Sequence, residues 1–404
     1  MNRSIIFYVI GSVLLCGSHQ LNGQKDFEVT TVPKEVRSRL NLDTFYEKHV
    51  NLNGFSIVGS SKVSDYALKE AAYLIAKLTQ KHPEYLQALV ANKVRFSIMA
   101  RNEYTTDIPE HSNMKPSVFW DKRARGLGAT HARPSVSCGE ENLLGITGDP
   151  YQRENILIHE FAHALHAMAI NDLDPLFQTK LQDCYNMAVN EGIWEGTYAS
   201  TNPAEYWAEG VQSWFECNRI NDREHGNINT RKEIVKEDPR LAELITAKLG
   251  DPPWKYIHIS KRLSQNPHLS GYKPNQEIPF AWPKKLIEWH EKFAQGEVSL
   301  APSDAKKVTP LNDVEKLKST YSRKRCQFFI HNLSGQTIDV HWIDFKGNLV
   351  QPRVLRHKDH TTIHSFTGHC WRIKSKNKTN EVLCHFFRLP IHHSAQLTIT
   401  DFIN

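Results

Sequence analysis

The chain has 404 residues, of which 40% are hydrophobic and 23% are charged, and its formal net charge is +6. This length exceeds what one typical core supports, so we expect two globular units with connecting segments. The composition excludes a collagen-like or broadly disordered chain. So mild a positive charge also argues against nucleic-acid binding, and we expect the short basic cluster at 323–325 to be solvated surface.

The first 23 residues have the pattern of an export signal. Arg3 gives a positive start, residues 5–16 form an apolar stretch, and small residues follow at possible cleavage points. The apolar stretch is too short to span a bilayer comfortably, and no later segment is long enough. We therefore expect a secreted, extracellular protein without integral membrane association. Removal of the signal leaves six cysteines, which permits up to three disulfides.

Helical patterns dominate from about residue 26 to residue 249. Residues 64–79 place apolar side chains at helical spacing, and residues 94–99 have the composition of a strand. An irregular stretch rich in glycine, proline and serine covers 126–138. Two strong helices are predicted after it, at about 150–170 and 203–218. Residues 251–300 show no clear periodicity, and their role stays unassigned.

The first strong helix carries a His-Glu-x-x-His motif. Asp149 and Pro150 have the residue types of a helix start. His159 and His163 are four residues apart, so their imidazoles lie one turn above each other and can reach a single ion. Glu160 projects beside them, where it can take a proton from a water activated by the metal. The pattern indicates one Zn²⁺ per chain, and the alternative is a helix with two surface histidines.

A third protein ligand is required, because catalytic zinc sites hold three protein ligands and keep a fourth position open. Asn202 and Pro203 form another helix start, and Glu205 and Glu209 then lie one turn apart on one face. Glu205 is also the third residue after the cap, where a glutamate can simply bond back to the backbone. Geometry alone leaves Glu205 and Glu209 as competing ligands.

This part of the chain resembles the gluzincin peptidases, and most of all their lethal-factor-type branch. In that branch a tyrosine lies seven residues before the ligand glutamate, as Tyr198 does before Glu205 here. The resemblance implies that Glu205 binds zinc and that Glu209 holds the other nitrogen of one ligand imidazole. It covers roughly residues 90–220. The same stretch, including 120–130, is similar to a family of exported, largely uncharacterised proteins with this metal motif.

The resemblance also implies a mechanism of metal-assisted peptide hydrolysis. Glu160 would activate water and pass its proton to the leaving amine, and Tyr198 would donate to the oxyanion. Related enzymes pair an extended substrate with an edge strand. Residues 126–137 are a candidate for that edge, with a plain structural loop as the alternative.

The C-terminal part of the chain changes character beyond residue 325. Residues 296–320 have the composition of a linker. Short runs rich in aromatic and β-branched residues follow at 326–331, 337–342, 361–364 and 370–374, separated by turns. This pattern is typical of an all-β module.

The module resembles the β-domain of the von Hippel–Lindau tumour suppressor, on residues 330–334, 340–347 and 363–371. The resemblance implies a small β-sandwich that binds a hydroxyproline-bearing peptide between tryptophans, a tyrosine, a serine and a histidine. Four residues fall on these pocket positions: Trp342, Ser365, His369 and Trp371. The tyrosine position falls on Pro352. The alternative is that both tryptophans fill the core and the histidine is an ordinary sheet residue.

Together these features predict a multidomain chain with an α+β zincin-type metallopeptidase domain and a C-terminal all-β sandwich. The expected boundaries are a signal peptide at 1–23, the peptidase domain at 24–300, a linker at 301–322 and the sandwich at 323–404. The expected partners are a protein or peptide substrate and, through the sandwich, extracellular hydroxylated protein. One alternative is a catalytically inactive extracellular binding protein, and another is a zinc hydrolase that cleaves a non-peptide amide.

Overall fold

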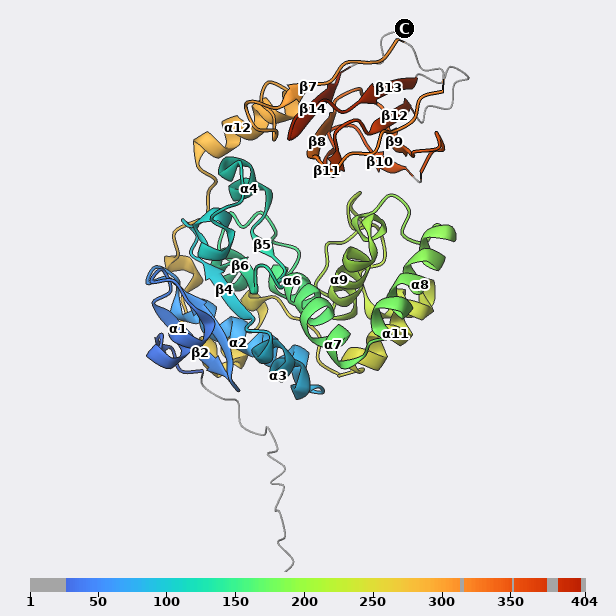
Figure 1. The fold of residues 1–404 in the computed structure, drawn as a ribbon. Helices are drawn as coiled ribbons and strands as arrows, with labels where there is room; N and C mark the ends of the chain where they lie inside the picture. Colours follow the sequence, from blue (N-terminus) through green and yellow to red (C-terminus); the bar gives the residue numbers. More distant parts are fainter. Residues whose placement is uncertain (1–26, 313–315, 351, 376–383, 401–404) are drawn as a thin grey trace, which may run out of the picture.

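A computed structural model of the chain describes residues 27–312, 316–350, 352–375 and 384–400 (Figure 1). The predicted export signal lies outside the described residues. A larger body, which holds residues 27–300, carries a mixed sheet on one side and a group of helices on the other. A β module at the C-terminal end lies beside the larger body and is joined to it through α12 (Lys284–Gln295).

The larger body contains a six-stranded sheet in the order β1-β2-β3-β4-β6-β5. Strands β3, β4 and β6 are parallel, whereas β5 is antiparallel to β6 and forms one edge. The strands are β1 (Thr30–Thr31), β2 (Lys48–Leu52), β3 (Phe55–Gly59), β4 (Arg95–Met99), β5 (Gly126–Leu127) and β6 (Ser135–Gly139). The predicted strand at 94–99 is confirmed as β4. The stretch predicted as irregular contains both β5 and β6.

Helices and short 3₁₀ turns surround this sheet. The helix predicted at 64–79 is confirmed as α2, whose apolar stripe packs into the core of the body. The elements are α1 (Lys34–Leu40), α2 (Asp65–Thr79), α3 (Pro83–Ala91), η1 (Thr105–Asp107), η2 (Pro109–His111), α4 (Ser117–Arg123) and α5 (Glu140–Leu144).

The helical side of the larger body faces the sheet across helix α6 (Figure 1). Its elements are α6 (Ile156–Leu165), the π-helical turn η3 (His166–Ile170), α7 (Asn171–Leu173), α8 (Phe177–Asn190), η4 (Tyr198–Thr201), α9 (Pro203–Trp214), α10 (Arg231–Glu237) and α11 (Pro239–Leu249). The helix predicted at 203–218 is confirmed as α9 and ends four residues earlier. The helix predicted from residue 150 begins six residues later than expected, at Ile156.

The reason for this late start is that Asp149 caps a turn rather than a helix. Its carboxylate accepts hydrogen bonds from the Tyr151 amide and from the Asn142 side chain, at 2.9 and 3.0 Å. The true cap is Asn155, whose side chain accepts from the Ile158 amide at 3.0 Å. Because aspartate and asparagine both cap helices well, local sequence could not distinguish the two starts.

The segment from 251 to 300 packs over the body in short turns and then forms α12. The turns are η5 (Ile259–Lys261), η6 (Leu263–Gln265), η7 (Pro267–Leu269) and η8 (Pro274–Gln276). Arg262 and His268 both contact the buried carboxylate of Glu70 on α2. These long-range contacts, and not a regular pattern of apolar residues, hold the segment on the body. This explains why its sequence shows no clear periodicity.

The β module consists of two four-stranded sheets, in the orders β10-β9-β12-β13 and β11-β8-β14-β7. Apolar side chains from both sheets form one core, which makes the module a sandwich. The strands are β7 (Lys306–Lys307), β8 (Arg325–Asn332), β9 (Ile338–Ile343), β10 (Arg353–Leu355), β11 (His360–Phe366), β12 (Cys370–Ser375), β13 (Cys384–Arg388) and β14 (Ser394–Ile399). All four predicted strand runs are therefore confirmed. Strand β7 lies inside the segment predicted as a linker.

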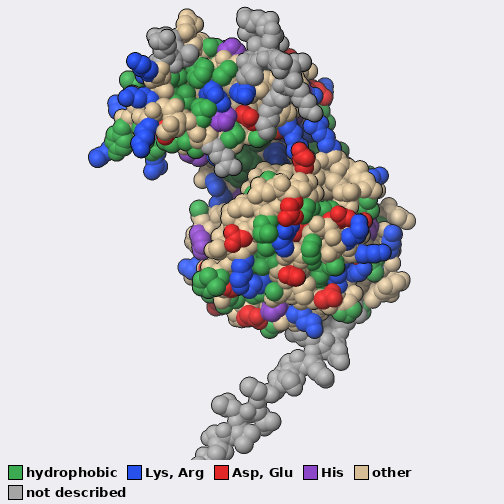
Figure 2. Space-filling model, turned by 90° about the vertical axis from the view of Figure 1, so that its right-hand side faces the viewer, with side chains coloured by type: hydrophobic (Ala, Val, Ile, Leu, Met, Phe, Trp, Pro, Cys, Tyr) green, Lys and Arg blue, Asp and Glu red, His purple; other side chains and the backbone are tan. Residues whose placement is uncertain are grey.

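An aromatic junction joins the two parts of the molecule. Phe293 of α12 stacks on His331 of β8 with ring centroids 4.3 Å apart. His360 of β11 lies edge-on to Phe293 at 5.3 Å and to Phe119 of α4 at 5.2 Å. The space-filling view shows the smaller module meeting the larger body at a narrow waist (Figure 2).

The six cysteines beyond the predicted signal are all free thiols. The expectation of up to three disulfides is thus not met among the described residues. Four of the thiols are buried, and this burial raises their pKa values: Cys138, Cys217, Cys326 and Cys370. A search of the described helices finds none with the length and apolar character needed to cross a membrane.

Candidate metal centre

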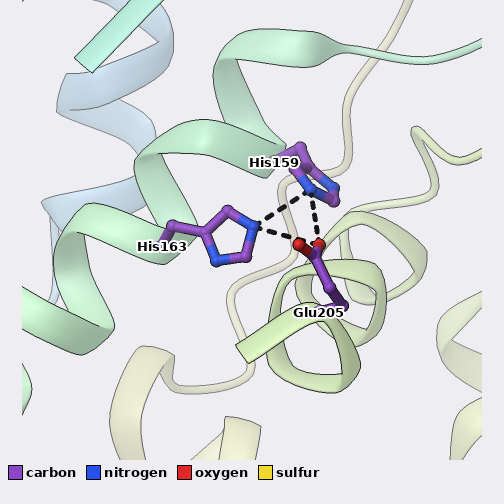
Figure 3. Close-up of side chains that lie close together, drawn as sticks. All are labelled: His159, His163 and Glu205. Carbon is purple, nitrogen blue, oxygen red and sulfur yellow. Dashed lines mark hydrogen bonds and ion pairs between the residues drawn. The ribbon is translucent and has the colours of Figure 1, made fainter. Parts of the chain in front are cut away.

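Three predicted ligand side chains converge between α6 and α9 (Figure 3). His159 and His163 extend from successive turns of α6, and Glu205 comes from the first turn of α9. The Nε2 atoms of the two imidazoles are 3.1 Å apart. Oε2 of Glu205 lies 3.2 Å from Nε2 of His163 and 3.3 Å from Nε2 of His159. The structure thus brings together the three residues that the sequence singled out.

The position of Glu205 follows from the way in which α9 begins. The side chain of Asn202 accepts hydrogen bonds from the amides of Ala204 and Glu205, at 2.9 and 3.0 Å. The cap is therefore made by Asn202 alone, and the carboxylate of Glu205 is free to turn toward the imidazoles. This removes the capping-box alternative for Glu205.

These three atoms fit a zinc ion. Ligand atoms bonded to zinc at about 2.0–2.1 Å in a tetrahedron lie about 3.3–3.4 Å from one another. The three separations in this centre are 3.1, 3.2 and 3.3 Å. Two imidazole nitrogens and a carboxylate oxygen are also a donor set that zinc accepts.

The charges around the centre favour a cation. Burial opposes a charge on His159, but the carboxylates of Glu205, Glu160 and Glu209 outweigh it and raise its pKa to about 10. Burial also opposes ionisation of Glu205, yet its hydrogen bonds with His159 and His163 hold its pKa well below the usual range. Burial raises the pKa of Glu160 as well. Three carboxylates around two imidazoles form a site that a divalent cation would neutralise.

Gln212 on α9 holds the ring of His159 through Nδ1, the nitrogen that is not directed at the other two ligand residues. Oε1 of Gln212 lies 2.8 Å from Nδ1 of His159, and Nε2 of Gln212 donates to the backbone oxygen of Asn155 at 3.2 Å. Glu209, to which the resemblance gave this task, lies farther from the same nitrogen, at 3.5 Å. Its carboxylate instead accepts from Asn218 at 2.8 Å. Sequence reasoning missed Gln212, although it lies two helical turns after Glu205.

Tyr198 lies beside Glu205 and His159. Its hydroxyl donates to Oε1 of Glu205 at 3.2 Å, and its ring is stacked 6.4 Å from the ring of His159. The guanidinium of Arg123, at the end of α4, acts on the same hydroxyl and lowers its pKa. Burial, together with the Glu205 carboxylate, raises the pKa of Tyr198, so the hydroxyl keeps its proton at neutral pH. Sequence reasoning gave no role to Arg123.

Strand β5 runs directly across α6 beside these residues. A Cβ atom added at Gly126 would lie 2.4 Å from Ile156 and 2.9 Å from Cγ of Glu160. One added at Gly128, just after the strand, would lie 2.8 Å from Cβ of His163. Both glycines therefore permit a close approach of the backbone to the helix. Among the described strands only β6 pairs with β5, so no described strand occupies its other edge.

His166 continues the histidine series by one turn but takes no part in the centre. Its Nε2 lies 2.7 Å from Oε1 of Gln178, and its ring packs edge-on against Phe177. Burial lowers the pKa of His166, which keeps the imidazole neutral. His166 is therefore a hydrogen-bonded neighbour of the centre and not one of its ligands.

The four pocket residues expected in the β module also lie close together. Oγ of Ser365 is 3.0 Å from Nδ1 of His369, and the ring of Trp342 lies 5.2 Å from the ring of His369. Trp371 pairs with Trp342 across β12 and β9, but it is only 7% exposed and belongs to the core. Core filling is therefore correct for Trp371, whereas Trp342 is half-buried at the rim.

A further aromatic residue, Phe345, lies at this rim and was missed by sequence reasoning. Its ring is 5.5 Å from Trp342 and 5.6 Å from His369, and it is 44% exposed. It follows Trp342 by three residues, in the turn after β9. Trp342, Ser365, His369 and Phe345 are named the rim cluster below.

Comparison with known proteins bears on the C-terminal module. Residues 317–388 match the model of the VHL beta domain family. The match begins six residues before the boundary expected from sequence, and it includes Ser319, whose hydroxyl accepts from Trp342 and from the Cys370 amide. The module is thus similar to VHL beta domains, which suggests a protein-binding role. A search of curated proteins finds no match for the chain.

Proposed function

We propose that the chain is an exported zinc-dependent metallopeptidase whose C-terminal module docks it onto protein. The observation that carries the proposal is the convergence of His159, His163 and Glu205 at separations of 3.1–3.3 Å, with Glu160 beside them. A purely structural zinc site usually has four protein ligands and needs no base. Export is supported by the pattern of the first 23 residues.

A zinc ion held by His159, His163 and Glu205 would supply Lewis acidity and lower the pKa of a bound water to about 7. Glu160 takes a proton from the attacking water and delivers it to the leaving amine. Its raised pKa suits both steps. Tyr198 keeps its proton and can donate it as a hydrogen bond to the oxygen that becomes negative in the transition state.

The edge of β5 that no described strand occupies supports a peptide rather than a small amide as substrate. An extended peptide can add to this edge as a further antiparallel or parallel strand, through backbone hydrogen bonds alone. Gly126 and Gly128 keep that edge close to Glu160 and His163. The scissile bond of a peptide paired there would lie over the three ligand side chains.

Docking through the β module is supported by the opposite positions of its two functional ends. His360, at the start of β11, contacts the larger body, whereas Ser365 of the rim cluster lies five residues further along the same strand. Five residues of extended chain span about 17 Å. The rim cluster therefore lies at the other end of this strand from the junction, which leaves it available for attachment to another protein.

The test of the peptidase proposal is the variant Glu160→Gln. Glutamine fills the same volume but cannot accept a proton, so we expect bound zinc to be retained and peptide cleavage to fall by at least about 10²-fold. Zinc content and cleavage of a peptide library, with and without chelator, measure the two quantities. Full activity in this variant would refute the assigned base, and a wild-type chain without stoichiometric zinc would refute the metal centre.

The test of the docking proposal is a comparison of peptides. A serine and an imidazole that face one hydroxyl, beside indole and phenyl rings, can read a hydroxylated proline ring. We expect a hydroxyproline-containing peptide to bind the full chain more tightly than its proline counterpart, and Ser365→Ala to abolish the difference. Equal affinities for the two peptides would contradict this specificity.

The second candidate is an extracellular binding protein without catalytic activity. It is favoured by one observation, the match of the C-terminal module to a protein-binding family. Under this alternative the chain binds peptide through the rim cluster but cleaves none. The zinc and cleavage measurements above distinguish the two candidates.

A further inference from the structure

A second group of potential ligands lies on the surface of the β module, where two strands enter one sheet side by side. Strand β7 pairs in parallel with β14, with Lys306 opposite Ala395. Two residues before these partners stand Asp304 and His393. Because residues in register on neighbouring strands are about 4.8 Å apart, the backbone alone brings these two positions together.

The side chains of this group converge on one point. Nε2 of His393 lies 3.2 Å from Oδ2 of Asp304, and Nε2 of the adjacent His392 lies 3.9 Å from the same oxygen. One nitrogen of each imidazole and one carboxylate oxygen all lie within 4.8 Å of one another.

The backbone of Ser394 sets the direction of one of these imidazoles. Nδ1 of His392 lies 3.0 Å from the carbonyl oxygen of Ser394 and 3.3 Å from its amide nitrogen, so it can donate to the first or accept from the second, depending on the tautomer. A hydrogen bond donated by Nδ1 leaves the lone pair of Nε2 pointing at the shared centre. In that tautomer His392 is prepared to act as a ligand.

We infer that Asp304, His392 and His393 form a second divalent-metal site, on the surface of the β module. Two imidazoles and one carboxylate suit zinc-like ions rather than calcium or magnesium, which prefer oxygen ligands. An ion pair with Asp304 would require only one of the two imidazoles. A bound cation would stabilise the approach of all three ligand atoms to one point. The inference does not rest on the proposed peptidase function, since it concerns other residues in another module.

The site differs from the first centre in its exposure. The side chains of His393 and Asp304 are 63% and 57% exposed, and no described carboxylate or imidazole closes the site further. The remaining coordination positions are therefore open to water or to a side chain of another molecule. An ion bound there would tie the segment before β7 to the turn before β14, and so fix the end of the linker to the sandwich.

The experiment is a zinc titration of the full-length, untagged chain after removal of metal by chelator. In the variant His159→Ala/His163→Ala, which removes two ligands of the first centre, we expect one equivalent of zinc to remain. Adding His392→Ala/His393→Ala should weaken the binding of this equivalent by at least about 100-fold, and adding Asp304→Asn by on the order of tenfold. His364→Ala, which removes an exposed imidazole on β11, is the matched control and should change nothing.

The same titration is carried out without the changes at His159 and His163, so that a folding defect in that variant cannot decide the result. There we expect two equivalents in the chain and one in the His392→Ala/His393→Ala variant. Retention of both equivalents in that variant overturns the inference, as does the absence of a second equivalent from the unaltered chain. If the unaltered chain binds only the equivalent that depends on His392 and His393, the result contradicts the peptidase centre and supports the second site.

Discussion

At the scale of single residues, the orientation of His159 depends on one amide group. Gln212 donates from Nε2 to the backbone of Asn155, so its Oε1 can only accept, and the proton of His159 is held on Nδ1. In the neutral ring that binds a metal, this leaves the lone pair of Nε2 directed toward Glu205 and His163. The amide thus fixes the ring orientation that a metal ligand needs.

Replacement of Gln212 by alanine tests this role. We expect Gln212→Ala to lower zinc affinity by about 10- to 100-fold, since a ligand histidine loses its partner, and Gln212→Glu to restore most of it. Competition with a chromophoric chelator measures the affinity. Gln178→Ala is the matched control, because Gln178 makes the equivalent bond to His166, which is not a ligand. Equal affinity in the Gln212→Ala variant and the unaltered chain would contradict the role.

The sequence identified His159 and His163 because their spacing is local, whereas Glu205 was preferred over Glu209 only through the family resemblance. Residues within about one helical turn determine both local features, the spacing of His159 and His163 and the cap at Asn202. Gln212 and Arg123 could not be found in the same way, since each acts on a residue far away in the chain. For Glu209 the resemblance gave the correct neighbourhood, but Gln212 makes the shorter contact.

At the scale of elements, the centre depends on how closely β5 approaches α6. The chain passes over the helix without a side chain at Gly126, in β5, and at Gly128, just after the strand. The contact aligns the edge of the sheet with the helix that carries both histidines. A side chain at either position must push the two elements apart.

The variant Gly128→Ala measures the importance of this contact. Its Cβ would lie 2.8 Å from Cβ of His163, closer than carbon atoms pack. We expect a loss of about 1–3 kcal/mol of unfolding free energy, together with weaker zinc binding, because His163 is displaced. Urea unfolding of the metal-free chain and zinc competition provide the two readouts. Leu127→Ala, between the two glycines, should leave zinc affinity unchanged, and an equal fall in both variants would rule out a specific effect at His163.

Several strands could not be predicted, because their burial is not expressed as hydrophobic alternation. Strand β6 is entirely buried, yet two of its five residues are serines. Ser135 bonds to Ser97 of β4 at 2.8 Å, and Ser137 faces His111 at 3.5 Å. Because these buried positions are polar, a prediction based on apolar periodicity does not detect the strand. Strands of the sandwich were easier to predict, since apolar and polar residues alternate along them and turn-forming residues separate them.

At the scale of the whole molecule, the junction between body and module is built from rings that must stay neutral. Burial, together with the charge of His357, lowers the pKa of His331 to about 4. Burial also lowers the pKa of His360 to about 4, with His331, Arg123 and His290 adding to the effect. Every charged neighbour that acts on these two imidazoles is cationic, so a proton on either is unfavourable in the docked arrangement.

The junction should consequently weaken in acid. An undocked imidazole titrates near 6.5, so the separated parts bind more protons than the docked form between pH 6.5 and 4. Docking is at full strength above pH 6.5 and is lost as the pH falls toward 4. For His331 alone, the docking equilibrium should be about 30-fold weaker at pH 5 than at pH 8.

Small-angle X-ray scattering at pH 8 and pH 5 measures this effect as an increase in the radius of gyration. The variant His331→Gln/His360→Gln, which cannot titrate at the junction, should lose the pH dependence. His364→Gln, at an exposed position of the same strand β11, should retain it. A radius that is independent of pH in the unaltered chain would contradict the prediction.

Strand β11 links the junction at His360 with the rim cluster at Ser365, and this has a mechanical consequence. Seven registered residue pairs join β11 to β8 along its length. If the outer end of the module is held by an immobile protein, tension on the molecule runs along these strands, and their transverse hydrogen bonds share the load in shear. The stacked rings of Phe293 and His331 carry no such bonds. Under tension, the module should therefore stay folded and bound to that protein, whereas its junction with the larger body should separate first.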